Sequence, residues 1–69
     1  MPTATSESLK KLVLKAVAGD KVFFLKEDNT WTTDRSEAHQ MYRFLIEDWV
    51  EQAAYALPEG TTELFGEYA

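Results

Sequence analysis

The residue types that could do chemistry are few in this chain and are poorly arranged for catalysis. His39 is the only histidine, there is no cysteine, and no Glu-x-x-His pattern is present, so we expect no metal site and no cofactor. The adjacent acids Glu47 and Asp48 point about 100° apart on a helix and cannot share a proton as a catalytic dyad does. The pair Glu27-Asp28 is typical of a turn. Because a lone histidine without such a pattern is a poor metal ligand, we expect His39 to be a half-buried structural residue.

Serine and glycine give no sign of a nucleophile or of a phosphate-binding loop. The serines are Ser6, Ser8 and Ser36, and none has a triad-like setting. The three glycines are scattered, so they form no glycine-rich loop. Because a domain of this size rarely encloses a water-excluding pocket, we do not expect an enzyme.

The most informative pattern is a stripe of acidic and aromatic residues on the solvent side of an expected helix. Phe44, Asp48, Glu51 and Tyr55 follow i, i+4, i+7, i+11 spacing, and Glu47 lies beside them. Aromatic anchors ringed by charge are typical of protein interfaces. The sequence therefore predicts a non-enzymatic interaction module in which these five residues bind a basic protein surface.

Two other arrangements would use the same stripe differently. The C-terminal tail could fold back and cover Phe44 and Tyr55 with Leu64 and Phe65. Alternatively, the protein could be a homodimeric structural component that buries the stripe against itself, which would bring like charges together.

The stripe depends on a long helix expected from Asp34 to Leu57. Asp34 and Glu37 form an aspartate variant of the capping box, and Pro58 with Gly60 supplies the stop. The residues between are mostly good helix formers, and their apolar members would form one wide face that covers a sheet.

The segment before this helix reads mainly as strands. Val22–Leu25 is bulky and β-favouring, and Gly19 with Asp20 before it makes a good hairpin turn. This context favours a strand at Lys11–Ala18, although the apolar residues of Leu9–Ala18 are also at helical spacing.

A second turn and a third strand complete the expected fold. Glu27–Thr30 has turn composition, and Trp31–Thr33 follows as a short strand. Residues 1–8 are expected to be frayed, and the tail at 59–69 to be a docked helical turn or a loose recognition segment. The expected fold class is α+β, a single domain at 1–69 with a small antiparallel β-meander or hairpin packed against one long C-terminal helix.

Size and composition indicate a soluble domain of marginal stability. The chain has 69 residues and 45% hydrophobic residues, which supports a real core, but a domain this small buries only about 60% of its unfolded surface. No apolar run is long enough to span a bilayer, and the N-terminus lacks the features of a secretory signal. We expect a cytoplasmic protein without a membrane partner.

Charge is distributed unevenly between the two halves of the chain. Residues 1–33 hold five lysines and four acids, a net charge of +1, whereas residues 34–69 hold two arginines and eight acids, a net charge of −6. An acidic half repels phosphates, so direct nucleic-acid binding is not expected, and it attracts a basic surface instead.

One stretch resembles a pattern in small accessory proteins of phages and mobile elements. It reads Val22-Phe-Phe-Leu, then Trp31-Thr-Thr-Asp34, then Ala38, and covers about twenty residues without a catalytic motif. The resemblance implies a role as an inhibitor of a host machine, of the anti-CRISPR or DNA-mimic type, that blocks a nucleic-acid-binding site. In that alternative the acidic helix would occupy phosphate-like positions on the target.

Overall fold

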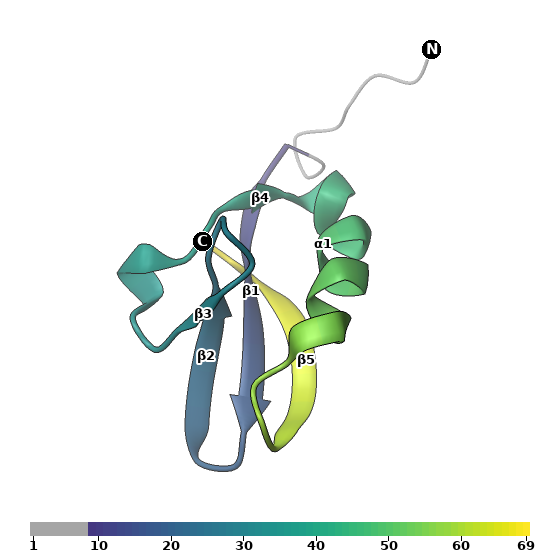
Figure 1. Cartoon of the computed structure of the whole chain (residues 1–69). Coiled ribbons are helices and arrows are strands. Elements are labelled where there is room, and N and C mark those ends of the chain that lie inside the picture. Colours follow the sequence, from purple (N-terminus) through teal and green to yellow (C-terminus); the bar gives the residue numbers. More distant parts are fainter. Residues whose placement is uncertain (1–8) are drawn as a thin grey trace.

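A computed structural model of the protein, which describes residues 9–69, has a five-stranded antiparallel sheet with a helical segment across one face (Figure 1). The strands are β1 (Lys11–Ala18), β2 (Lys21–Leu25), β3 (Trp31–Thr32), β4 (Met41–Tyr42) and β5 (Thr61–Tyr68). The helices are the 3₁₀ turns η1 (Arg35–Glu37), η2 (Arg43–Leu45) and η3 (Ala54–Ala56), and the α-helix α1 (Ile46–Ala53). The frayed start expected at 1–8 lies outside the described residues.

The central strand of the sheet is β1. Along one edge it pairs first with β4, at Lys11 and Leu12, and then with β2, from Lys15 onward. Along its other edge it pairs with β5, and β3 pairs with the outer side of β2. Because β1 is flanked on both sides, it holds β2, β4 and β5 together in one sheet.

The predicted β-meander is confirmed for its three strands. Lys11–Ala18 is a strand with the expected bounds, so the helical alternative for this segment is wrong. Gly19 has φ +65° in the turn between β1 and β2, a conformation that glycine adopts without steric cost. The third strand ends at Thr32, one residue earlier than predicted.

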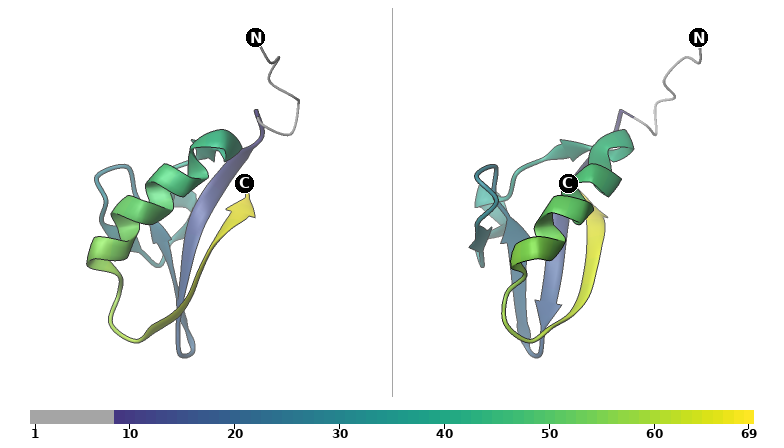
Figure 2. Two further views of the ribbon diagram at one scale, coloured as in Figure 1. Left: turned by 90° about the vertical axis from the view of Figure 1, so that its right-hand side faces the viewer. Right: turned by 45° about the vertical axis from the view of Figure 1, so that its right-hand side comes forward.

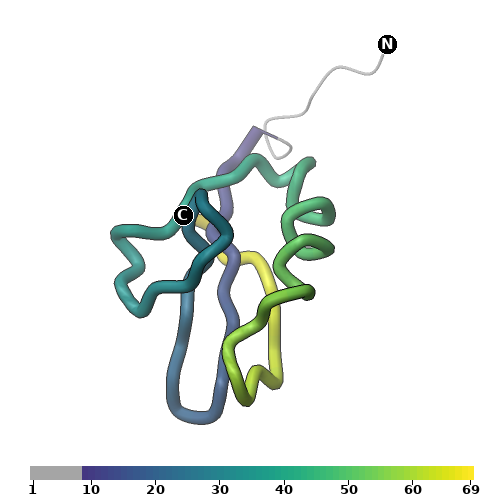
Figure 3. Tube along the Cα trace, viewed as in Figure 1, coloured from purple at the N-terminus to yellow at the C-terminus, as the bar shows by residue number. Residues whose placement is uncertain are grey.

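The predicted helix from Asp34 to Leu57 is wrong in its first half. Asp34 caps only the short turn η1, where its side chain accepts hydrogen bonds from the hydroxyl and backbone N–H of Ser36 that hold the pKa of Asp34 below its usual value. After this turn the chain loops back beside β1 (Figure 3), where Met41 pairs with Leu12 and is buried. Strand pairing and the burial of Met41 override helix propensity here.

The helical segment, which we define as Arg43–Ala56, occupies the middle of the chain and not its end. The tail forms neither a helical turn nor a loose segment but the eight-residue strand β5. Gly60, with φ +82°, makes the turn that leads into it. The predicted architecture of a meander under one long C-terminal helix is therefore wrong, although the chain is α+β in the broad sense.

The main core lies between the sheet and the helical segment (Figure 2). Alternate residues of β1, among them Leu12 and Leu14, face the helix, in keeping with the two-residue period of a strand. Gly66 of β5 allows the helix to approach closely, because a Cβ there would lie 3.2 Å from Cδ1 of Ile46 and 3.3 Å from Cδ1 of Leu12. The other members of this core are Leu25, Met41 and Ala53, with Trp31, Trp49, Val50 and Leu64 packed against them.

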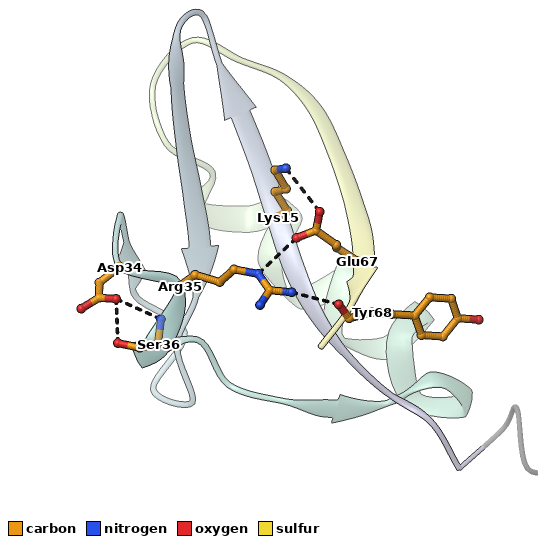
Figure 4. Close-up of polar contacts among 6 residues, drawn as sticks. All are labelled: Lys15, Asp34, Arg35, Ser36, Glu67 and Tyr68. Atoms are coloured by element: carbon orange, nitrogen blue, oxygen red, sulfur yellow. Dashed lines mark hydrogen bonds and ion pairs between the residues drawn. The ribbon is translucent and has the colours of Figure 1, made fainter.

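The opposite side of the sheet, which we call the open face, is crossed by the side chain of Arg35. Arg35 extends from η1 across the sheet, where its Nε lies 3.3 Å from a carboxylate oxygen of Glu67 and its Nη2 donates to the Tyr68 carbonyl at 2.9 Å (Figure 4). Lys15 approaches the other oxygen of Glu67 at 3.6 Å. On this face Val13 is only 2% exposed.

Candidate protein-binding face

The five residues predicted to bind a partner all lie on the helical segment and are exposed to solvent. The α-helix has one inward side, since Ile46, Trp49 and Val50 pack against the core and Ala53 is buried in it. Residues at the remaining positions of the helical period point away from the sheet. The set that we call the helix stripe is Phe44, Glu47, Asp48, Glu51 and Tyr55.

The aromatic members of the helix stripe are well exposed. Tyr55 is 88% exposed and Phe44 is 60% exposed. Phe44 stacks on Tyr42, with ring centroids 5.6 Å apart and planes inclined by 15°. This contact holds the Phe44 ring in place without burying it, which limits the rotamer freedom that the ring would lose on binding.

The tail does not cover the helix stripe, so that alternative is wrong. Leu64 packs into the core beneath the helical segment. Phe65, the next residue of β5, points to the open face, where Lys15 lies 5.5 Å from its ring centroid. Leu64 and Phe65 therefore lie on the two faces of the sheet and not over the helix stripe.

The acidic members of the helix stripe have no partner in the described part of the chain. Within residues 9–69, no ion pair or hydrogen bond involves the side chain of Glu47, Asp48 or Glu51. Glu67 on the open face, in contrast, is held by two cations. Three unneutralised carboxylates within five residues produce a local negative potential beside the exposed rings.

A hollow of about 540 Å³ borders the stripe where the helical segment meets β5. Its lining includes Phe44 and Glu47 on one side and Gly66 and Tyr68 on the other. Tyr68 was missed in the sequence because the tail was not expected to be a strand. Tyr42, 40% exposed, was missed because the expected long helix would have turned it inward.

His39 plays no part in this face. It is half-buried, as expected, and its ring lies 4.8 Å from that of Trp49. Over residues 9–69 no three His, Cys, Asp or Glu side chains are grouped so that they could hold a metal ion. In the same part of the chain, every helix is too short or too polar to cross a membrane.

Comparison of the chain with protein-family models, with curated proteins and with solved structures finds no match. The candidate face therefore rests on the geometry and charge of the residues themselves.

Proposed function

We propose that the protein is a small interaction module that binds a basic protein surface through the helix stripe. The observation that carries the proposal is the coincidence, on one outward side, of two exposed aromatic rings and three carboxylates that no residue from 9 to 69 pairs with. Aromatic side chains supply large contact area at low entropic cost, and unpaired carboxylates attract a complementary surface.

The two kinds of side chain have different roles in this proposal. The carboxylates of Glu47, Asp48 and Glu51 are exposed, so they act over a distance of about 10 Å at ordinary salt and mainly raise the association rate. The rings of Phe44 and Tyr55 lose water only on contact, so they mainly slow dissociation. A partner surface with lysine or arginine around an apolar pocket would bind both the carboxylates and the rings.

The direct test removes both rings. Immobilised wild-type protein and the double variant Phe44→Ala/Tyr55→Ala are each exposed to lysate of cells that carry this protein, at low salt. We expect at least one basic protein to be retained by wild type and lost by the variant, by a factor of about 10 or more in bound amount. Thermal unfolding of both proteins should coincide, because both rings are exposed.

The matched control exchanges the ring types, as Phe44→Tyr/Tyr55→Phe, and should retain the partner. Equal retention by all three proteins would contradict the proposal, and so would unfolding of the double alanine variant, since it would place the rings in the core. If added duplex DNA displaces the retained protein, the surface of that protein that contacts the helix stripe is one that also binds nucleic acid.

A further inference from the structure

The outer edge of β5 presents backbone groups of Leu64 and Gly66 that have no hydrogen-bond partner within residues 9–69. The N–H of Ala69 donates to the carbonyl of Lys11 at 3.1 Å, which makes these two residues a hydrogen-bonded pair of the β1–β5 ladder. Such pairs alternate along an antiparallel ladder, so Phe65 and Glu67 also direct their N–H and C=O groups to β1. The N–H and C=O groups of Leu64 and Gly66 therefore point outward, where none of residues 9–69 bonds to them.

This edge has little of the usual protection of natural edge strands, because its one register irregularity lies near Thr61 and leaves the ladder regular from Glu63 to Tyr68. β5 is eight residues long and contains no lysine, arginine or proline, the residues that commonly prevent edge-to-edge pairing. Both views of Figure 2 show no described segment alongside β5 on the side away from β1. An edge of this kind is a template for another strand.

A second copy of β5 fits this edge when Phe65 lies opposite Phe65 of that copy. In this antiparallel register Leu64 of each copy lies opposite Gly66 of the other, and their outward N–H and C=O groups form the bonded pairs. On the helix side, Ile46 and Leu12 pack over Gly66 of each copy, so the opposing Leu64 would meet these apolar side chains. On the open face the two Phe65 rings, each 39% exposed, come together as a cross-strand aromatic pair.

Charge on the open face favours the same register. Glu63 is exposed, and within residues 9–69 its carboxylate has no ion-pair or hydrogen-bond partner. It would lie opposite Glu67 of the second copy, which is already held by Lys15 and Arg35 of that copy. This group of two cations and one carboxylate carries a net charge of +1, so it attracts Glu63, and symmetry repeats the attraction on the other side of the Phe65 pair.

We propose that two copies of this protein pair antiparallel through β5, centred on Phe65, so that their sheets become one continuous sheet. The occupant of the edge is a second copy and not an unrelated peptide, because both the central ring pair and the flanking charges are self-complementary. This pairing is made by backbone groups of β5, and of the helix stripe only Phe44 and Glu47 lie near it, across the hollow that Gly66 also lines. The dimer and the binding of a basic partner are tested by separate experiments, so either proposal can be contradicted without the other.

The test combines sedimentation with amide hydrogen exchange of the full chain, in a concentration series up to about 1 mM. We expect a monomer–dimer equilibrium in which the amides of Leu64 and Gly66 become protected as the dimer forms. The amides of Phe65 and Glu67 are the internal control, because they bond to β1 in both states and should be protected throughout. A monomer at every concentration would overturn the proposal, and so would a dimer in which Leu64 and Gly66 stay unprotected.

A matched pair of charge variants tests the register. Glu63→Lys would set a lysine against the net positive group of the second copy, and we expect the dissociation constant to rise about 10-fold or more relative to Glu59→Lys. Glu59 is exposed and precedes β5, so its variant makes the same change of net charge outside the paired strand. Equal dissociation constants for the two variants would contradict the register.

Discussion

The open face of the sheet and the helix stripe are both surfaces where aromatic rings lie among charges, but they differ in what the charges contact. On the open face, Glu67 is held by Lys15 and Arg35, and Phe24 beside them is only 7% exposed. On the helix stripe, Tyr55 is 88% exposed, and none of the three carboxylates has a partner among residues 9–69. Similar residue types thus stabilise the fold in one place and remain available for binding in the other.

The largest expected contrast comes from removing one ring from each surface. Phe24→Ala should lower the free energy of unfolding by about 3 kcal/mol, because it removes a buried ring and leaves a cavity. Tyr55→Ala should change it by less than about 0.5 kcal/mol, because its ring is in water in the folded protein. Urea unfolding of the two variants measures both values. Similar losses of stability for the two variants would mean that the surfaces do not differ as described.

A smaller contrast comes from the charges. Arg35→Ala removes the ion pair with Glu67 and the hydrogen bond to the Tyr68 carbonyl, and should lower the free energy of unfolding by about 1 kcal/mol. The value is modest because Arg35 and Glu67 remain partly in water. Glu51→Ala should leave stability nearly unchanged, since the side chain of Glu51 is exposed and has no partner in the part of the chain that the structure describes. The cost of Arg35→Ala should shrink at high salt, and a cost for Glu51→Ala of the same size would refute the distinction.

The sequence predicted the parts of the fold that depend on neighbouring residues. The hairpin of β1 and β2 follows from an apolar strand, a Gly19-Asp20 turn and the Val22–Leu25 run, all close together in the chain. The core of the helix was also predicted, because Ile46, Trp49, Val50 and Ala53 keep helical spacing.

The parts that were wrong depend on contacts between distant residues. Met41 leaves the expected helix because the start of β1 has a free edge beyond the end of β2, and Met41 pairs there with Leu12. The strand β5 was missed because its apolar residues, Leu64 and Phe65, are adjacent and so mask the alternation of a strand. Its pairing with β1 spans most of the chain. Local patterns carry no signal for such pairings.

The helix stripe was placed correctly on solvent although the helix itself was mispredicted. All five of its residues fall between Arg43 and Ala56, the part of the expected helix that does form. Only the spacing within this segment decides which side chains share a face. The neighbouring rings of Tyr42 and Tyr68 could not be predicted, because strands bring them there.

The most direct measurement of the binding proposal is the salt dependence of association with the protein retained in the capture experiment. The variant Glu47→Lys/Glu51→Lys reverses two charges of the helix stripe, and Glu27→Lys/Glu59→Lys reverses two exposed charges elsewhere. We predict that the stripe variant associates about 10-fold more slowly than the control at low salt, with a flatter salt dependence. Equal rates and equal salt slopes for the two variants would show that the stripe carboxylates do not guide binding.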